Sequence, residues 1–391
     1  MLPETESLGR TLKRKAAIIG YGELKPGKRS DKSPMELYAE VSKLAIKDAG
    51  IKKSDIDGLL CVQVGNNFVF EELVDYLRIQ PTFCAGMNVG GATHSAMAIH
   101  AASAITSGVA DIVLCASAGR FRKVPEIGEG IMRLISHPDF ELIYGTFIPA
   151  LYALSAKRHM HDYGTTSEQL ARVAVSARKW ANMNPDALMY DKGPLTVEDV
   201  LNSPMIADPF HYYDCSIPCE GGGAFVIAST EIAKRVCKTP MYLLGAGECH
   251  TQGFATWTPD FSTHGAKVSG KRAFDMAGLR PKDVDVLEIY DSFTSNPIMY
   301  LEDLGFCEKG EGGKVFQAGR CDPGGDLPLN TFGGLLSFGH TGMSSGIIQS
   351  IEAARQLMGR AGNRQVKDAE VALAHTYGGM TCDHATLIWG R

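Results

Sequence analysis

The sequence predicts an α/β fold built from two similar halves, in each of which helices cover a sheet. Three observations carry this prediction: an internal repeat, the alternation of strand-like and helix-like stretches, and a glycine turn ahead of a helix in each half. The first half is expected over residues 1–235, with an inserted loop segment at about 119–215, and the second half over residues 236–391.

The repeat joins residues 44–61, "LAIKDAGIKKSDIDGLLC", to residues 272–289, "RAFDMAGLRPKDVDVLEI". Identical residues recur at one constant offset, among them Ala45 and Ala273, Ala49 and Ala277, Gly50 and Gly278, Asp55 and Asp283, and Asp57 and Asp285. Each copy reads as a helix closed by a glycine, then a short turn and an apolar strand. The duplication predicts a pseudo-two-fold axis, and strands that alternate with helices favour mostly parallel pairing.

The strand and helix pattern continues after each copy of the repeat. After the first copy, a Gly-Gly turn leads into a helix expected at about 95–107, and the apolar strand "DIVLCASA" follows at 111–118. After the second copy, residues 333–359 again read as a turn and a helix, and a strand follows at 369–379. The two halves therefore share one order of elements.

The inserted segment is less regular than the halves around it. Helices are expected at 148–162 and 167–183, followed by the aromatic stretch "DPFHYYDC" at 208–215. Residues 221–229, "GGGAFVIAS", then return to a core strand. We expect this insertion to cover a pocket.

The composition describes a globular chain of 391 residues with 45% hydrophobic and 21% charged residues. Its net charge of −5 argues against non-specific binding to nucleic acid or anionic lipid. No apolar run reaches the ~18 residues of a membrane-spanning helix, and the polar N-terminus lacks the apolar core of a secretory signal. The ten scattered cysteines therefore indicate reduced thiols in a cytoplasmic protein, and no metal site is predicted.

Two helix starts give the first indication of chemistry. The Gly90-Gly91 turn and "SFGHTGM", which holds His340, each precede a helix whose first backbone N–H groups are unpaired and favour anions. If two-fold symmetry relates the halves, both helix starts face a common centre. We therefore expect His340 to meet the Gly-Gly turn there.

Four longer motifs extend these observations: "DCSIPCEGGGAFVIAS", "VDVLEIYDSFTSNPIMYLEDLGFCEKGEGG", "LPLNTFGGLLSFGHTGM" and "VALAHTYGG". Together with the duplicated halves, they resemble the thiolase superfamily over nearly the whole chain, and most closely its sterol-carrier-protein or lipid-transfer type. The resemblance implies the five-layered αβαβα thiolase fold and activity on coenzyme A thioesters. It also implies coenzyme A as a co-substrate and no tightly bound cofactor.

The resemblance places catalytic residues on particular positions. His340 keeps the glycine-histidine pair of the family and is expected to act as the base. Tyr290 stands in "YDSF", where the family has Asn or His in an oxyanion hole, and His375 stands at the position of the second catalytic Cys. The nucleophilic Cys of the family falls on Gly91, which cannot attack a carbonyl.

The missing thiol leaves two routes for a thiolase reaction. Either Cys84, which lies seven residues before Gly91, points into the pocket and supplies a relocated thiol, or the thiol of free coenzyme A attacks directly. In both cases Tyr290, His375 and the backbone N–H groups of the glycine turn are expected to stabilise the oxyanion. The other expected oxyanion and substrate-binding residues are His94, Asp291 and Gly379. Asp291 has an equal alternative reading as a helix N-cap or turn residue.

We expect an atypical thiolase that cleaves a bulky 3-oxoacyl-CoA, aromatic ones such as benzoylsuccinyl-CoA included, in a reaction of the β-oxidation type. A retro-aldolase of the steroid side-chain type is the main alternative, because it needs a base and an enolate site but no nucleophile. Such aldolases are expected to carry a second Tyr after the glycine-histidine turn, where this chain has Ser344 and Ser345. A biosynthetic acyl transferase and a non-catalytic acyl-CoA-binding scaffold are the remaining alternatives.

The resemblance also implies protein partners. Lipid-transfer-type proteins of this family commonly work with a small zinc-ribbon/OB-fold subunit, so a heteromeric complex around a homodimer core is expected. Neither nucleic acid nor a membrane is expected as a partner.

Overall fold

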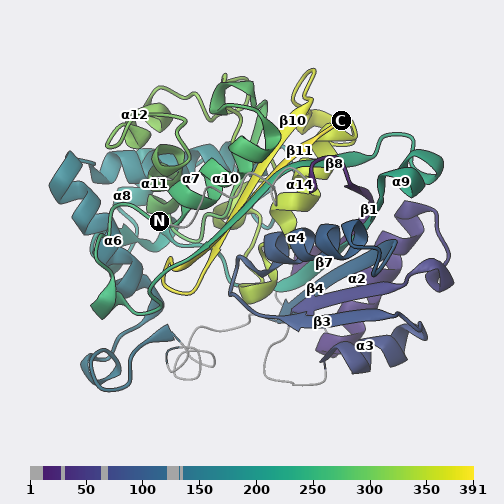
Figure 1. Cartoon of the computed structure of the whole chain (residues 1–391). Helices are drawn as coiled ribbons and strands as arrows, with labels where there is room; N and C mark the ends of the chain where they lie inside the picture. The colour runs from purple at the N-terminus through teal and green to yellow at the C-terminus, as the bar shows by residue number, and fades with distance from the viewer. Residues whose placement is uncertain (1–11, 28–30, 63–68, 121–131, 133–134) are drawn as a thin grey trace.

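The computed structural model describes residues 12–27, 31–62, 69–120, 132 and 135–391. Their central feature is a nine-stranded mixed sheet in the order β3-β2-β4-β7-β1-β8-β11-β10-β9 (Figure 1). Its strands are β1 (Ala16–Gly27), β2 (Gly58–Val62), β3 (Phe83–Met87), β4 (Ile112–Arg120), β7 (Glu220–Ser229), β8 (Met241–His250), β9 (Val286–Ile289), β10 (Val371–Gly378) and β11 (Asp383–Gly390). A separate pair consists of β5 (Met205–Ala207) and β6 (Phe210–His211).

The sheet repeats its strand order about its middle, where β1 pairs with β8 through Ala17 with Tyr242 and Ile18 with Met241. Moving outward, β1, β7, β4 and β2 on one side correspond to β8, β11, β10 and β9 on the other. Among the described residues, the edge strand β3 has no counterpart beyond β9. This order fits the pseudo-two-fold axis that the internal repeat predicts.

The expectation of mostly parallel strands is wrong. In the described part of the large sheet, three pairs are parallel, namely β2 with β3, β2 with β4 and β9 with β10. The other five pairs are antiparallel. A parallel pair needs a crossover connection, whereas antiparallel neighbours can be joined by a short turn. The strand β11 follows β10 through such a turn, and β7 returns from the inserted segment to run antiparallel between β4 and β1.

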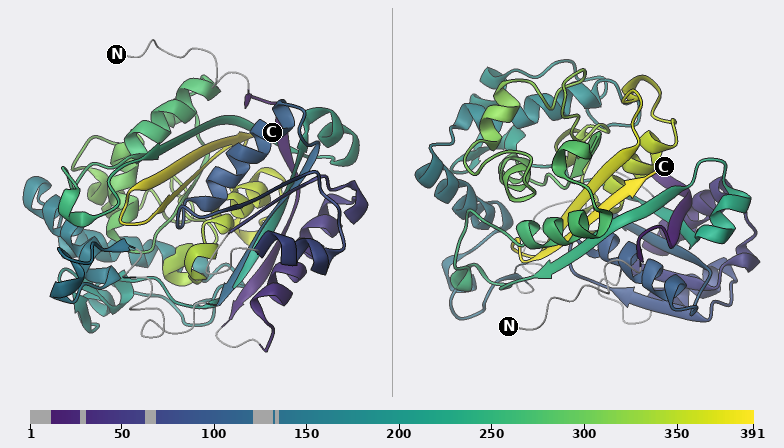
Figure 2. Two further views of the ribbon diagram at one scale, coloured as in Figure 1. Left: turned by 60° about the horizontal axis from the view of Figure 1, so that its bottom comes forward. Right: turned by 45° about the horizontal axis from the view of Figure 1, so that its top comes forward.

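Helices form layers on both sides of the sheet and between its halves. The helix α2 (Pro34–Ala49) covers the outer face of the first half, and α10 (Ala266–Ala277) covers the outer face of the second (Figure 1). Between the halves, α4 (Thr93–Thr106) lies against α14 (Ile347–Leu357) (Figure 2). The order α2, first half-sheet, α4 with α14, second half-sheet, α10 is the five-layered arrangement that the resemblance implies.

The outer helices have the start and stop signals that the repeat predicts. Ser33 and Glu36 form a capping box at the start of α2, each side chain accepting the backbone N–H of the other residue. Gly50 ends α2 and Gly278 ends α10, both in the left-handed conformation with a φ of 67°. The glycines shared by the two copies are therefore helix C-caps.

The inserted segment contains the two expected helices, with small differences at their ends. They are α6 (Ile148–Tyr163) and α7 (Ser167–Ala181), and α8 (Val197–Leu201) follows. The helix α7 packs against α12 (Gly312–Gln317) and α13 (Gly334–Ser337) of the second half. The remaining α-helices of the described ranges are α3 (Val69–Leu77), α9 (Thr230–Val236) and α11 (Ser295–Asp303). The insertion thus covers the second half on the side where residue 340 lies.

The longest helices, α2 and α6, have 16 residues each. None of the helices in the described ranges is both long enough and apolar enough to cross a membrane.

The small residues of the repeat lie where each outer helix crosses a central strand. A Cβ on Gly20 of β1 would come within 2.3 Å of the backbone nitrogen of Ala49. A Cβ on Gly245 of β8 would come within 2.0 Å of the carbonyl oxygen of Ala273. Each helix therefore packs its backbone directly on a strand glycine, and the alanines shared by the two copies permit this close approach.

We expect Gly20→Ala and Gly245→Ala each to lower the free energy of unfolding by about 1–3 kcal/mol, because the added methyl group overlaps helix backbone. Denaturant unfolding measures the change. Gly27→Ala, at the end of β1 with no atom within 4 Å of the new Cβ, is the matched control. Unfolding midpoints equal to that of the control would contradict this account of the helix–strand contact.

Candidate active site

The ends of two strands and the starts of two helices meet at one place between the halves. Tyr290 directly follows β9, and its backbone N–H donates to the carbonyl of His375 in β10 at 2.9 Å. Gly91 precedes α4, and His340 precedes α14. The structure brings Tyr290, His340 and the Gly91 turn together, as the two-fold symmetry leads one to expect.

Tyr290 and His340 form a hydrogen-bonded pair. The phenol oxygen lies 2.7 Å from Nε2 of the imidazole, and the two ring planes are 86° apart. On the other side of the imidazole, Nδ1 lies 3.0 Å from the hydroxyl oxygen of Ser216. The backbone of His340 is also held, because its N–H donates to Ile217 at 2.7 Å and its carbonyl accepts from Cys219 at 2.9 Å.

Burial sets the protonation of this pair. Desolvation lowers the pKa of His340 to about 4, so the imidazole is neutral and able to accept a proton at neutral pH. Burial raises the pKa of Tyr290 above its usual value, and a hydrogen bond with Ser345 acts in the opposite direction. The phenol therefore carries its proton at neutral pH and can share it with Nε2.

The turn before α4 has no room for a side chain. A Cβ on Gly91 would lie 2.4 Å from the carbonyl oxygen of Tyr377 and 2.8 Å from ring atoms of Tyr290. Gly90 has a φ of 60°, and a Cβ there would lie 2.8 Å from the Cα of Gly378. The ring of Tyr290 thus occupies the space in which a side chain at position 91 would stand. A side chain at position 91 would require this ring and the backbone of Tyr377 to move.

Cys84 lies on the face of the sheet opposite α4. It is next to Leu59 of β2 and packs with the core formed by α2 and α3. Its neighbours Phe83 and Ala85 face the α4 side instead. Burial raises the pKa of the Cys84 thiol. The two-residue period of the strand turns this side chain away from His340. On the sequence alone we expect Cys84 to point into the pocket, and the structure does not place it there.

His375 belongs to a separate buried cluster. Its Nδ1 lies 2.9 Å from the hydroxyl of Thr386, and its Nε2 lies 3.4 Å from Nδ1 of His384. Its ring packs against Tyr300 with the ring centroids 5.0 Å apart. Burial and the neighbouring histidines lower the pKa of His375. Among the described contacts, none joins this side chain to the tyrosine–histidine pair.

Two other expected binding residues lie at the glycine turn. His94, the second residue of α4, is fully buried, and its Nδ1 lies 2.8 Å from where a Cβ on Gly346 would be. Burial lowers the pKa of His94 to about 3. The carbonyl of Gly379 accepts from the phenol of Tyr152 at 2.8 Å, and its nitrogen would lie 2.8 Å from a Cβ on Gly90. A role for either residue in binding an oxyanion stays a prediction.

Asp291 serves the backbone of a neighbouring helix. Its Oδ1 accepts from the backbone N–H of Leu335 at 2.7 Å, in the first turn of α13. Burial raises the pKa of Asp291 to about 8, and the backbone donors of Leu335 and Leu336 act against this rise. A Cβ on Gly334 would lie 2.0 Å from Oδ2, so the carboxyl group is enclosed. Asp291 is the N-cap of neither helix, since α13 has Gly333 and α11 has Thr294 at that position, and a catalytic role for Asp291 stays a prediction.

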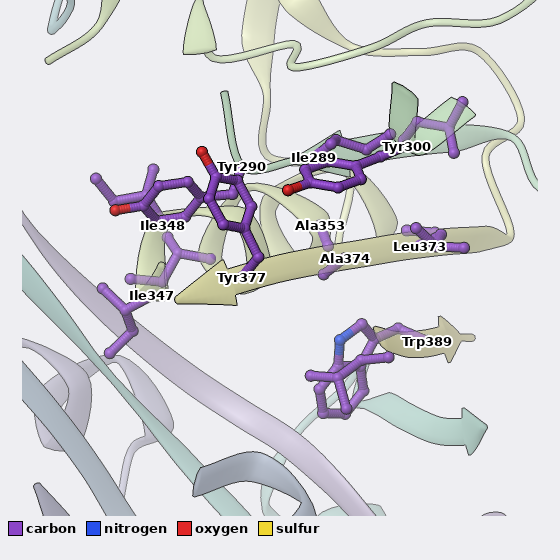
Figure 3. Packing of buried hydrophobic residues seen from close by; sticks show 14 of the residues in the cluster. Ile289, Tyr290, Tyr300, Ile347, Ile348, Ala353, Leu373, Ala374, Tyr377 and Trp389 are labelled. Carbon is purple, nitrogen blue, oxygen red and sulfur yellow. The ribbon is translucent and has the colours of Figure 1, made fainter. Parts of the chain in front are cut away.

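Three further residues around the pair are not singled out by the sequence: Ser216, Tyr377 and Tyr152. The ring of Tyr377 lies 5.0 Å from that of Tyr290, and Figure 3 shows these two rings and that of Tyr300 beside one another on one face of β10. The strand period of "HTYGG" could have identified Tyr377. No local signal marks Ser216 or Tyr152, because both reach the site from the inserted segment or its border.

All ten cysteines are free thiols. Within the ranges that the structure describes, no three His, Cys, Asp or Glu side chains are grouped so that they could hold a metal ion.

The chain resembles known proteins along nearly its whole length. A family profile described as "Thiolase C-terminal domain-like" matches residues 247–391. The chain is 35% identical to the acetyl-CoA acetyltransferase of Methanothermobacter thermautotrophicus, over 97% of this chain and 100% of that protein. It is 30% identical to benzoylsuccinyl-CoA thiolase subunit BbsB of Thauera aromatica, over 94% of this chain and 96% of that protein.

A solved structure shares the same architecture. The Ltp2-ChsH2(DUF35) aldolase matches with a TM-score of 0.87 and 31% identity, covering 97% of this chain and 98% of that chain. The similar proteins therefore include enzymes named for both acyl transfer and aldol cleavage.

We expect Gly91→Ala to lower the free energy of unfolding by about 1–3 kcal/mol, because the new Cβ overlaps the ring of Tyr290 and the carbonyl of Tyr377. Gly91→Cys is expected to show the same loss and to form no acyl-enzyme detectable by mass spectrometry. Thermal unfolding measures the stability, with Gly253→Ala, where a Cβ meets open space, as the control. A stable Gly91→Cys variant that is acylated would refute the steric argument.

We expect kcat/KM to stay level between about pH 5 and 8, because the lowered pKa of His340 keeps the imidazole neutral throughout this range. Initial rates at low substrate concentration across this range measure the profile. A loss of activity on acidification with an apparent pKa of about 6.5, the value of an exposed histidine, would be the opposite result.

Proposed function

Because the chain belongs to the thiolase superfamily, we propose that it cleaves a carbon–carbon bond of a coenzyme A thioester by proton transfer through Tyr290 and His340, without an acyl-enzyme. The observation that carries this proposal is the 2.7 Å contact between the phenol oxygen and Nε2, beside a turn with no space for a thiol. Retro-aldol cleavage of a 3-hydroxyacyl-CoA fits this pair best, since it needs acid–base groups and an enolate site but no nucleophile.

In the retro-aldol reaction, Nε2 of His340 takes the phenol proton of Tyr290 while the phenol oxygen takes the proton of the 3-hydroxyl group. The electrons of that O–H bond form the new carbonyl, and those of the Cα–Cβ bond move into the thioester to give an enolate. Backbone N–H groups at the Gly91 turn, at the positive end of α4, stabilise the enolate oxygen. The proton on His340 then returns through the phenol to the α-carbon. A ketone or aldehyde and a shortened acyl-CoA leave, and no water or oxidant is consumed.

Retro-Claisen cleavage is the second candidate, and the 30% identity to a benzoylsuccinyl-CoA thiolase subunit favours it. In this reaction His340 takes the proton of the coenzyme A thiol, and the thiolate attacks the 3-carbonyl of a bulky, for example aromatic, 3-oxoacyl-CoA. The tetrahedral oxyanion collapses to one acyl-CoA and an enolate, which regains the proton to become the second acyl-CoA. The position of Cys84 gives no support to a relocated enzyme thiol.

We also propose that the chain works as a homodimer with a small zinc-ribbon/OB-fold subunit. The similar solved structure pairs Ltp2 with ChsH2(DUF35), which supports such an assembly. Light scattering on the chain, alone and co-expressed with a DUF35 protein, measures the mass of the complex.

Product analysis distinguishes the two reactions. The protein is incubated with a bulky aromatic 3-hydroxyacyl-CoA without free coenzyme A, and separately with the matching 3-oxoacyl-CoA plus coenzyme A. Release of an aldehyde or ketone from the alcohol supports the retro-aldol reaction. Two thioesters formed only from the 3-oxo substrate support the retro-Claisen reaction. Binding of both substrates with turnover of neither would favour a scaffold and contradict the proposal.

We expect Tyr290→Phe and His340→Asn each to lower kcat by about 10²- to 10⁴-fold, the usual contribution of a positioned acid–base group. Steady-state kinetics on the substrate that turns over provide the measurement. Cys84→Ser is the matched control and is expected to keep wild-type activity, because this thiol faces the opposite side of the sheet. If Cys84→Ser lowered kcat as much as Tyr290→Phe does, the thiol of Cys84 would have to take part in the reaction.

A further inference from the structure

We propose that Ser216 is a positioning residue for His340: its hydroxyl oxygen accepts the Nδ1–H of the imidazole and thereby holds the Nε2 lone pair toward Tyr290. The catalytic consequence of this arrangement rests on the proposed function. The tautomer that it fixes is a property of the protein without substrate, so the two can be tested separately.

The segment that contains Ser216 connects the two catalytic turns. The backbone N–H of Ser216 donates at 2.9 Å to the carbonyl of Ser292, in the turn that follows β9. The next residue, Ile217, accepts the N–H of His340 at 2.7 Å, and Cys219 donates to the carbonyl of His340 at 2.9 Å. These hydrogen bonds hold the backbone of residues 216–219 against the backbone of His340. The serine hydroxyl is thereby kept near Nδ1, at 3.0 Å.

The hydrogen bonds around the phenol select one imidazole tautomer. If the phenol of Tyr290 donates to the ring, its partner is Nε2 at 2.7 Å. If Nε2–H donates instead, the phenol proton must go to another acceptor, the carbonyl of Gly342 at 3.4 Å or the hydroxyl of Ser345. Only the first arrangement keeps the phenol proton in the 2.7 Å contact, where the O–H, a stronger acid than the imidazole N–H, faces the basic ring nitrogen. The neutral ring then carries its own proton on Nδ1, and Ser216 is the acceptor for it.

An uncharged partner suits a base that must release its proton within one turnover. A carboxylate at Nδ1 would stabilise the imidazolium ion and hold the proton on the ring. A hydroxyl orients the ring without adding that charge. The proton taken at Nε2 can therefore return through Tyr290 to the α-carbon, while the proton at Nδ1 never leaves the ring.

Nitrogen-15 NMR of the histidine side chains reports the tautomer directly. In the wild-type protein at neutral pH, the His340 signals, assigned by their loss in His340→Asn, are expected to show a protonated Nδ1 and a bare Nε2. Ser216→Ala is expected to shift the ring toward the other tautomer and to lower kcat about five- to tenfold at a similar KM, the effect of one lost hydrogen bond. Ser216→Thr keeps the hydroxyl and is expected to restore both.

Ser203→Ala is the matched control, because it removes a hydroxyl that bonds the carbonyl of Val200 in the inserted segment, and it is expected to change neither signal nor rate. Circular dichroism checks that each variant is folded. A protonated Nε2 in the wild type, or an unchanged tautomer in Ser216→Ala, would overturn the proposal. If neither substrate class turns over, the proposed function fails, and the NMR result still decides the role of Ser216.

Discussion

The contact between the ring of Tyr290 and the turn at Gly91 is the constraint on which the centre of this molecule depends. A side chain at position 91 and a phenol at position 290 exclude each other, because a Cβ on the glycine would stand 2.8 Å from the ring. Once the ring fills this space, its oxygen reaches Nε2 of His340. The same close packing removes water from the pair and sets the direction of both pKa shifts. The packing of Tyr290 against Gly91 therefore accounts for the missing side-chain space, the hydrogen bond to His340 and the burial that shifts both pKa values.

Much of the fold could be predicted because its signals are local. The C-cap glycines Gly50 and Gly278 and the shared alanines mark the outer helices, and the structure gives each a physical reason. Strand direction could not be predicted in this way. Whether two strands run parallel depends on which strands become neighbours, and the insertion of β7 between β4 and β1 is decided by packing across the whole half.

The features of the site also differ in whether they can be predicted from local sequence. Symmetry between the halves was enough to predict that the Gly91 turn and His340 converge. The direction of Cys84 was not accessible, since apolar residues occupy both alternate positions of "FCAGM" and leave the phase of the strand undefined. Ser216 and His340 are 124 residues apart, and their contact exists only after the inserted segment has folded back to β7.

The two halves of the chain contribute different residues to the site. Tyr290 and His340 both come from the second copy, whereas the first copy contributes the bare turn at Gly91 and its border segment contributes Ser216. Neither half contains all of these residues, so the site forms only where the two halves meet. A side chain at position 91 of the first half would therefore require the second half to rearrange at two places, the ring of Tyr290 and the backbone of Tyr377.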